Sequence, residues 1–450
     1  MARRIPLPRL TQRQREARWQ RERRQQSIIL VVFTVLLCSA VGLMVWEGAN
    51  RYYDANLKAA AMIDGHALPY RLYDHEKAYE LQKFYADNGV PVAYENDPQI
   101  ATQKANYDGV AVNSLVEQAL LETMARQEGY TISNADLQAT YEDSFSQYSS
   151  RHILVKVDTT ATDLAAADAA ALAKAQDIAK QLRAAPNDQE LWNTLAKTSD
   201  DTGSKDSGGE IGWVGKGQLV APYDDAARKL AIGDISDPVK SDYGYHVIQV
   251  KERRPAAANP VIQRWLSRGF GMDEILLHTK YDMYRDHFTA QAQAAAVTSP
   301  TEQIHLLHIL ISLPSPTSGV PTDFTDALKK IAAMKAELDK GTDFAEVAKT
   351  YSEDTTEAAN GGDAGWFAHG QLDSLSKDTE LFALAPGTVS RQFTTPSQAD
   401  FYKVVEKDPA KALTDAQTTK IHDQAYAYWF DKNRRVHDVR KLVPGFEFQP

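Results

Sequence analysis

Cysteine is almost absent from this 450-residue chain, in which Cys38 is the only one. A single thiol excludes an intramolecular disulfide framework and any zinc site built mainly from cysteines. Glycine (24 residues) and proline (19 residues) occur at ordinary levels, so the chain is not a collagen-like fibre. The composition, 43% hydrophobic and 24% charged, also excludes wholesale disorder, and the length allows about three ordinary domains.

Acidic residues outnumber basic ones outside the N-terminus. Residues 1–26 hold nine arginines and two glutamates, a net charge of +7, whereas the whole chain carries −10. The remaining 424 residues therefore carry a net charge of −17. Because an acidic body of this size repels a phosphate backbone, we expect no nucleic-acid partner.

A long uncharged run follows the arginine-rich segment. Ser27–Trp46 reads SIILVVFTVLLCSAVGLMVW, and a helix of these 20 residues spans about 30 Å, the thickness of the hydrocarbon core. Arginines before the run favour a cytoplasmic N-terminus and place the residues after Glu47 outside. The sequence therefore predicts a single-pass anchor in the cell membrane, with the bulk of the chain extracytoplasmic.

A cleaved signal peptide is the alternative interpretation of this run. The hydrophobic region of a signal peptide is typically about 7–15 residues long and precedes a small-x-small site, whereas WEG at 46–48 is a poor site. A lipoprotein signal at Cys38 is disfavoured because Leu37 stands where a small residue is needed. Either interpretation sends residues 49–450 across the membrane. The basic tail either lies on the anionic inner leaflet or serves only as a topology signal.

The outer part of the chain contains a repeat. The segment GGEIGWVGKGQL (208–219) aligns with GGDAGWFAHGQL (361–372), and seven of the twelve positions are identical. Upstream of each segment, RHILVKV aligns with LHILISL. Two copies follow, which we call repeat 1 (151–253) and repeat 2 (304–406). At about 100 residues, each copy is long enough to be a small domain rather than a solenoid unit.

Hydrophobic patterning gives repeat 1 the order β-α-α-(β)-α-β-β. Alternating Val/Ile-rich stretches predict strands, Ala-rich and amphipathic stretches predict helices, and the glycine-rich segment predicts a loop with a short strand. The predicted elements are a strand at 152–157, helices at 164–182 and 191–197, the loop at 203–217, a helix at 224–230, and strands at 235–239 and 245–251. The expected fold class is α+β, with helices packed around a small antiparallel or mixed sheet.

The segments around the repeats have mainly helical patterns. A strand-turn-helix pattern is expected within 49–79, and helices are expected at 100–128, 272–296 and 414–433. The predicted organisation is a basic tail (1–26), a transmembrane helix (27–46), an N-terminal helical region (49–150), repeat 1 (151–253), a helical connector (254–303), repeat 2 (304–406), and a C-terminal helix and tail (407–450).

Four motifs, taken in order, resemble the parvulin (PpiC) family of peptidyl-prolyl isomerases. They are the RHILVK strand, the S-D-D segment, the GG-x-x-GW-x-x-x-GQ loop and the YGYHVIQV strand. The match covers all of repeat 1 and most of repeat 2. The region before repeat 1 resembles the N-terminal region of SurA-, PrsA- and PpiD-type foldases. By this resemblance, the helical segments outside the repeats form a chaperone module.

The resemblance also implies which residues form the site of repeat 1. His152 and His246 match a pair of histidines that meet and share a hydrogen bond. Asp201 falls where the family carries Cys or Asp beside the reactive amide. These three are the expected catalytic residues. The expected substrate-binding residues, including the wall for the proline ring, are Gln218, Leu219, Tyr223 and Ser241.

Prolyl isomerisation needs neither a metal nor a cofactor. Amide resonance opposes rotation about the peptide C–N bond with a barrier of about 18–20 kcal/mol. A dry pocket favours the twisted amide, which has lost charge separation, and donors aimed at the twisted form lower the barrier further. We therefore expect non-covalent catalysis in repeat 1, with no cofactor and no metal.

Repeat 2 departs from the family pattern. His308 and Asp354 keep two of the three expected catalytic positions, but Asp400 replaces the second histidine. The aromatic position is also lost, and one residue is inserted after Gln371. We expect repeat 2 to lack both a partner for its histidine and a wall for proline, and to have little or no isomerase activity.

The leading hypothesis is a membrane-anchored, extracytoplasmic isomerase and foldase that acts on unfolded or translocated polypeptides. The alternative is an ATP-independent holdase chaperone whose repeats only bind clients. A third hypothesis is a scaffold of a membrane secretion complex. The sequence defines neither the clients nor the oligomeric state.

Overall fold

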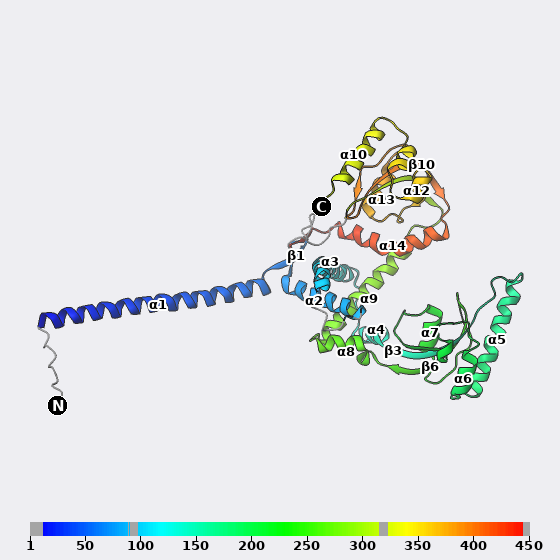
Figure 1. The fold of residues 1–450 in the computed structure, drawn as a ribbon, viewed down its shortest axis with the longest axis horizontal. Helices are drawn as coiled ribbons and strands as arrows, with labels where there is room; N and C mark the ends of the chain where they lie inside the picture. The colour runs from blue at the N-terminus through cyan, green and yellow to red at the C-terminus, as the bar shows by residue number, and fades with distance from the viewer. Residues whose placement is uncertain (1–11, 89, 91–97, 315–322, 444–450) are drawn as a thin grey trace, which may run out of the picture. The chain divides into compact units, whose positions relative to one another are not determined.

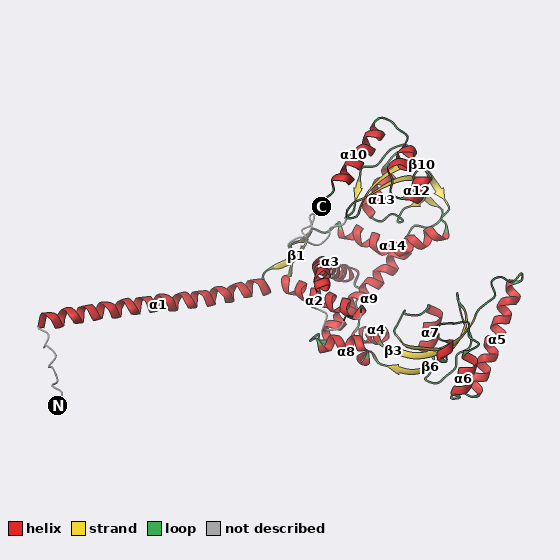
Figure 2. Cartoon of the chain, viewed as in Figure 1, coloured by secondary structure: helices red, strands yellow, loops and turns green. Residues whose placement is uncertain are grey.

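The structure is a computed structural model that describes residues 12–88, 90, 98–314 and 323–443 (Figure 1). The first eleven residues of the predicted basic tail and the last seven of the predicted C-terminal tail lie outside the described residues. Helices and strands are mixed along the chain (Figure 2), which confirms the α+β fold class.

The described residues group into two compact units. The first comes from Met1–Leu81, Asp97–Val116 and His437–Pro450, and the second from Gln82–Asn96 and Glu117–Val436. Both repeats belong to the second unit, so the site residues predicted from the sequence all lie there.

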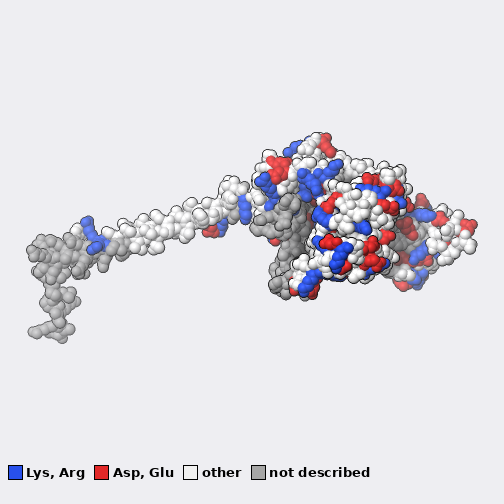
Figure 3. All heavy atoms as spheres, turned by 90° about the horizontal axis from the view of Figure 1, so that it is seen from above, with Lys and Arg blue, Asp and Glu red and all other residues white. Residues whose placement is uncertain are grey.

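The chain begins with a long helix, α1 (Gln12–Asn56), which continues without a break because no proline occurs in it. Its stretch Leu30–Tyr53, with a mean hydropathy of 2.2, is the one helix in the described part that is long and apolar enough to cross a membrane. Figure 3 shows charged side chains on α1 only toward its two ends. This stretch includes most of the predicted segment 27–46 and continues past Glu47 and Arg51, which pair with each other one turn apart. Membrane anchors and signal sequences both have helices of this kind.

A three-stranded antiparallel sheet in the order β11-β1-β2 follows α1 in the first unit. β1 (Ala59–Ile63) and β2 (His66–Pro69) form a hairpin over Asp64-Gly65, whose φ angles of 49° and 81° are those of an Asp-Gly turn. β11 (Val439–Lys441) pairs with β1 although almost 380 residues separate them along the chain. The sequence indicated the strand, turn and helix here but not the pairing with β11.

Helices account for most of the chain outside the repeats. They are α2 (Tyr70–Asp87), α3 (Pro98–Glu128), α4 (Asn134–Phe145), α8 (Pro260–Ser267), α9 (Met272–Ala294) and α14 (Asp415–Arg434).

Repeat 1 is a four-stranded antiparallel sheet in the order β4-β3-β6-β5. Its elements are β3 (Gln147–Val155), α5 (Leu164–Ala184), α6 (Gln189–Ala196), the 3₁₀ turn η2 (Lys205–Ser207), β4 (Glu210–Val214), α7 (Ala221–Lys229), β5 (Val239–Ser241) and β6 (Gly244–Arg254). The first strand begins five residues before its predicted start, because the alternating pattern extends back through buried Tyr148 and Ser150.

The alternation of side chains along β3 gives the sheet two buried faces. Ile153 and Val155 pack with α5 and α6 on one face, around fully buried Trp192. Tyr148 points to the other face, where it joins Tyr223 of α7 and Ile248 of β6. Since His152 is an even number of residues from Tyr148, it shares the face covered by α7.

Repeat 2 has the same sheet order, β8-β7-β10-β9. Its elements are β7 (Thr301–Ser312), α10 (Thr325–Asp339), α11 (Phe344–Tyr351), α12 (Thr355–Ala359), β8 (Asp363–Ala368), α13 (Leu375–Ala383), β9 (Phe393–Thr394) and β10 (Gln398–Lys411). The repeated sequence thus folds into a repeated architecture.

Candidate active site

Neighbouring strands bring the two histidines of repeat 1 together. The register pairs Leu154 of β3 with His246 of β6, so His152 is the diagonal neighbour of His246 on the same face. Their Nδ1 atoms are 3.1 Å apart and the rings lie nearly parallel, at 16° with centroids 5.3 Å apart. The structure therefore shows the histidine pair that the family resemblance implies.

Two further side chains extend the pair into a line of hydrogen bonds. His152 Nε2 lies 2.9 Å from Asp201 Oδ2, and His246 Nε2 lies 2.7 Å from Ser241 Oγ. Because a carboxylate can only accept, His152 donates through Nε2 and accepts through Nδ1 from His246. His246 then accepts through Nε2 from the Ser241 hydroxyl. One consistent set of neutral tautomers thus runs from Ser241 to Asp201.

Electrostatics favour this neutral arrangement. Burial lowers the pKa of His152, although Asp201 acts in the opposite direction. Burial and repulsion by His152 lower the pKa of His246 to about 4. For Asp201, burial would raise the pKa, but hydrogen bonds from Ser204, His152 and the Gly203 N–H outweigh it and lower the pKa to about 2. At neutral pH the site therefore holds two neutral imidazoles beside one fixed carboxylate.

Tyr223 packs against both imidazoles in T-shaped contacts. Its ring meets that of His152 at 73° and that of His246 at 87°, with centroids 5.5 and 5.4 Å away. Its hydroxyl lies 3.0 Å from Ser150 Oγ, and the side chain is only 2% exposed. Burial raises the pKa of Tyr223, so its phenol stays neutral. Tyr223 thus holds the imidazole rings in place rather than presenting an open surface to a ligand.

The remaining predicted residues lie at the edge of this cluster. Leu219 is half-buried and packs on the hydrophobic cluster around Tyr223. Gln218 is exposed, and its side-chain oxygen accepts from the Gly215 N–H at 2.7 Å. Gln218 therefore holds its own loop in shape, and the structure does not bring it into contact with the histidines. Ser241 also lines a surface hollow of about 450 Å³, whose other lining residues include neither histidine nor Asp201.

Close approach to the backbone of β3 explains the double glycine of the repeated motif. Gly209 has φ of +77°, and a Cβ at this position would lie 2.1 Å from the His152 carbonyl oxygen. The His152 N–H donates to the Gly209 carbonyl at 2.9 Å. The glycine-rich segment therefore has to pass directly against the strand that carries the histidine, and a larger residue would push them apart.

Several serines complete the site, and sequence reasoning did not single them out. Ser204, which is 4% exposed, donates to Asp201. Ser199 Oγ accepts from the Leu154 N–H at 3.0 Å and from the Asp201 N–H at 3.2 Å. The S-D-D segment was a usable signal for Ser199, because this residue ties the segment to β3. No local pattern marked Ser204.

Repeat 2 surrounds its histidine with charge. His308 Nε2 lies 3.1 Å from Asp400 Oδ1, and His308 Nδ1 lies 2.7 Å from Glu357 Oε2. The ammonium of Lys377, which is only 5% exposed, lies 3.3 Å from the other oxygen of Asp400. Tyr402 stacks on His308 at 4.6 Å and 11°.

One expectation for repeat 2 is wrong. His308 does have a partner on the last strand, because Asp400 accepts its hydrogen bond. Asp354 does match Asp201, since each accepts from the N–H two residues later and each follows a serine that accepts from the first strand, but Asp354 caps α12 and does not bind His308. One turn later, Glu357 supplies the carboxylate that reaches His308.

The lost aromatic position is filled by Lys377. In repeat 1, Tyr223 precedes Asp224, which accepts from the Gly217 N–H at 3.2 Å. In repeat 2, Lys377 precedes Asp378, which accepts from the Gly370 N–H at 3.1 Å. The shared loop contact aligns the two aspartates, so lysine stands where repeat 1 has tyrosine.

The charged cluster changes the protonation of the histidine in repeat 2. Burial would lower the pKa of His308, but hydrogen bonds to Asp400 and Glu357 raise it to about 9. His308 is thus an imidazolium at neutral pH. Within the described ranges, no group of three or more His, Cys, Asp or Glu side chains is arranged to hold a metal ion.

Comparison with known proteins agrees with the geometry. The profile described as the PPIC-type PPIASE domain matches residues 152–252, and a second profile with the same description matches 292–408. The foldase protein PrsA of Geobacillus kaustophilus is 33% identical over 185 residues, which cover 41% of this chain and 57% of that protein. The chaperone SurA of Thiobacillus denitrificans is 26% identical over 337 residues, covering 73% and 64%.

The chain therefore spans less than two thirds of the length of these relatives. The crystal structure of the peptidylprolyl isomerase PrsA from Bacillus cereus aligns with 50% of this chain and 76% of that chain, with 21% identity and a TM-score of 0.27. Since both profile matches fall on the repeats, residues 152–252 and 292–408 are two domains of the PPIC-type PPIase family.

Proposed function

We propose that repeat 1 is a peptidyl-prolyl cis-trans isomerase and that the chain is a membrane-anchored foldase. The observation that carries the proposal is the hydrogen-bonded line of Asp201, His152, His246 and Ser241 within a PPIC-type domain. The clients would be unfolded or translocated polypeptides, in keeping with relatives named foldase and chaperone.

The proposed mechanism uses the charge that a peptide bond loses when it twists. A planar amide carries partial negative charge on its oxygen, and rotation about C–N removes it. A carboxylate fixed beside that oxygen opposes the charge-separated form and so favours rotation. Asp201 can act in this way because Ser204, Gly203 and His152 hold it in one position as an anion. The repulsion is weaker in the transition state than in the ground state, and this difference lowers the barrier.

The other residues of the proposed site have supporting roles. Neutral His152 and His246, which are 6% and 5% exposed, offer a less polar surrounding than water. Leu219 provides the apolar edge for a proline ring. Ser241 sets the tautomer of His246, and Tyr223 keeps both imidazoles in place. No covalent step is needed, and the reaction uses no cofactor.

Repeat 2 is proposed to have little or no isomerase activity. Lys377 fills the position of the aromatic side chain, and Asp400 takes that of the second histidine. The proposal includes the boundaries 151–253 and 304–406 for the two domains.

The test is isomerisation of a proline-containing peptide by the full chain in detergent micelles. Wild type should accelerate cis-trans exchange, His246→Ala should abolish most of the acceleration, and Asp400→Ala should leave it unchanged. Exchange no faster than in buffer, or equal activity in His246→Ala, would reject the proposal.

A holdase is the second candidate. In repeat 2, Lys377 and Asp400 occupy the positions of Tyr223 and His246, and a domain without the catalytic groups can still bind polypeptides. A holdase should suppress aggregation of an unfolded protein equally well after His152→Ala and Asp201→Asn. Suppression that disappears in both variants would contradict it.

The proposed anchor has its N-terminus in the cytoplasm and the repeats outside. The support is the apolar helix Leu30–Tyr53 with nine arginines before it. Protease added to intact cells should then digest the repeats, and the protein should sediment with membranes. Release of a chain that begins after the helix would instead identify a signal sequence.

A further inference from the structure

The C-terminal helix α14 covers the glycine-rich loop of repeat 2. Gln424, with its amide nitrogen toward the loop, reaches the carbonyl oxygens of Gly370, Gln371 and Leu372 at 2.8, 3.0 and 3.2 Å. Tyr428 donates to the Leu372 carbonyl at 2.6 Å. The loop therefore presents three adjacent carbonyl oxygens to one face of a helix.

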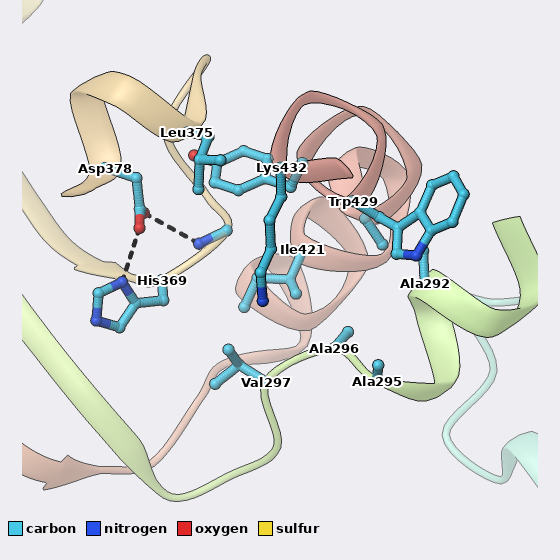
Figure 4. A pocket seen from close by; sticks show the side chains of 13 residues that line it. Ala292, Ala295, Ala296, Val297, His369, Leu375, Asp378, Ile421, Trp429 and Lys432 are labelled. Carbon is cyan, nitrogen blue, oxygen red and sulfur yellow. Dashed lines mark hydrogen bonds and ion pairs between the residues drawn. The ribbon is translucent and has the colours of Figure 1, made fainter. Parts of the chain in front are cut away.

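An aliphatic residue of α14 completes this contact. A Cβ at Gly370 would lie 3.6 Å from Ile421, so helix and loop meet at van der Waals distance. Figure 4 shows Ile421 and Lys432 of α14 near His369 and Asp378 of repeat 2, around a hollow of about 330 Å³. Ile421, Gln424 and Tyr428 are spaced by three and four residues, so they form one stripe along the helix.

The corresponding loop of repeat 1 has the same internal hydrogen bonds. The Gly215 N–H donates to Gln218 at 2.7 Å, and the Ala368 N–H of repeat 2 donates to Gln371 at 2.7 Å. The contacts of Gly217 with Asp224 and of Gly370 with Asp378 likewise correspond. The same bonds therefore fix both loops at Gly217 and Gln218 and at Gly370 and Gln371, although repeat 2 has one more residue between its loop and the aspartate.

In repeat 1 this loop is uncovered. Gln218 is exposed and Leu219 half-buried, whereas Gln371 and Leu372 are 6% and 4% exposed. A Cβ at Gly217 would meet nothing within 4 Å. Lys216, which precedes the loop, lines a hollow of about 510 Å³ together with residues of α4 and α9 such as Asp143 and His287.

The helix that follows repeat 1 is placed elsewhere. α8 is the first α-helix after repeat 1 in the chain, as α14 is after repeat 2. Its buried Trp265 packs on Phe145 of α4 at 5.8 Å, and Arg264 donates to the Tyr85 carbonyl at 2.9 Å. α8 is thus committed to the neighbouring helices and leaves the loop of repeat 1 uncovered.

We propose that the loop Gly217–Leu219 of repeat 1 is a docking surface for an amphipathic helix of another polypeptide. The helix it fits carries an aliphatic residue, a glutamine three positions later and a tyrosine four positions after that, as α14 does. The surface consists of backbone carbonyl groups of the loop, and it shares Leu219 with the proposed apolar edge for a proline ring.

One contact of α14 does not transfer to repeat 1. Gln417 donates to Gln303 at 3.0 Å in repeat 2. The equivalent glutamine of repeat 1, Gln147, already accepts from Arg254 at 2.6 Å. The docking helix should therefore be selected by the aliphatic, glutamine and tyrosine stripe, and not by a glutamine at the position of Gln417.

The test uses the full chain in detergent micelles and a fluorescent peptide with the sequence of Asp415–Arg434. Its anisotropy should rise in a saturable manner. Gly217→Asn should weaken binding about tenfold, because its side chain occupies the place where the aliphatic residue of the helix would lie. Gly233→Asn is the matched control: Gly233 also has a positive φ (+91°) and open space around it, and asparagine tolerates that conformation. It should leave binding unchanged, and the peptide with Gln424→Ala and Tyr428→Ala should bind weakly.

Hydrogen exchange of the wild type provides a second measurement that needs no variant. The peptide should protect residues 215–219 and not 368–372. The proposal is overturned if binding is absent, if Gly217→Asn binds as well as wild type, or if protection appears only at 368–372. Self-association of the chain that Gly217→Asn removes would also overturn it, since the occupant would then be a second copy. Isomerisation is assayed separately, so failure here is distinguishable from failure of the proposed enzyme.

Discussion

The two repeats share a sheet order, a glycine-rich loop and a histidine on the first strand, yet they surround that histidine in opposite ways. In repeat 1, His152 lies between one carboxylate and a second imidazole, and both rings are neutral. In repeat 2, His308 lies between two carboxylates and is protonated. The same backbone thus supports either a neutral cluster or a charged one.

A single exchange accounts for much of this difference. Asp400 brings a second buried carboxylate to His308, which raises the pKa of the imidazole. Asp400 is fully buried, so a charge there needs nearby cations. Lys377 supplies one by occupying the aromatic position, so repeat 2 lacks the aromatic ring that holds the imidazoles of repeat 1 in place. The comparison shows that one acidic residue at this position requires others to change as well.

The largest expected effect tests whether Lys377 compensates for Asp400. Lys377→Met should destabilise repeat 2 by about 3 kcal/mol, because it leaves a buried carboxylate short of a partner. Urea unfolding of the full chain, followed by hydrogen exchange of β7 and β10, would measure it. Lys349→Met is the matched control, since its pair with Glu346 is exposed, and it should change nothing measurable. A stable Lys377→Met variant would show that His308 alone balances Asp400.

The next prediction gives repeat 1 the residue of repeat 2. His246→Asp should lower kcat/KM for prolyl isomerisation about a hundredfold, because the neutral imidazole is replaced by a second carboxylate. The pKa of His152 should rise, which histidine NMR titration would detect. The reverse change, Asp400→His in a His246→Ala background, should restore no activity while Lys377 occupies the aromatic position. Restored activity would mean that the residue on the last strand, at position 246 or 400, alone accounts for the difference in isomerase activity between the repeats.

The third prediction concerns pH, for which the two repeats should respond in opposite directions. The pKa of His246 falls from 6.5 to about 4 on folding, so its contribution to stability is present above pH 6.5 and is lost as pH falls toward 4. The pKa of His308 rises from 6.5 to about 9, so its contribution is present below pH 6.5 and is lost as pH rises through 9. Hydrogen exchange resolved by repeat at pH 5, 7 and 9 would measure both. Parallel responses would contradict the assigned protonation states.

The smallest expected effect concerns Ser204. Ser204→Ala removes a hydrogen bond that lowers the pKa of Asp201, so that pKa should rise. If catalysis requires the anion, the acid limb of the pH–rate profile should move to higher pH, with activity at neutral pH reduced by no more than about threefold. Ser207→Ala is the control, because Ser207 donates to the Ser204 carbonyl and not to Asp201. If the acid limb does not move, the ionisation of Asp201 does not determine how the rate depends on pH.

The sequence predicted the part of the site that depends on regular geometry. The family resemblance implied that His152 and His246 meet, and the antiparallel pairing of β3 with β6 brings them together. The glycine motif predicted a loop with a short strand, and the structure adds that this segment passes directly against β3. Both features belong to motifs whose order and spacing can be read directly from the sequence.

The parts that sequence reasoning missed depend on small displacements. Asp354 and Glu357 are one helical turn apart, and Glu357 reaches His308 from the position that Ser204 occupies in repeat 1, while Asp354 is held by backbone N–H groups of α12. The insertion after Gln371 moved the alignment by one residue and hid the correspondence between Lys377 and Tyr223. β11 escaped notice because three residues carry too little pattern to predict a strand.

The pairing of β11 with β1 has a consequence for biogenesis. β11 is synthesised almost 380 residues after β1, so the sheet β11-β1-β2 cannot assemble until residue 441 has been made. Until then, one edge of β1 exposes unpaired backbone groups. The unit that follows the apolar helix is thus completed only after both repeats have been synthesised, and a chain that stops before residue 439 would leave its hairpin open to aggregation.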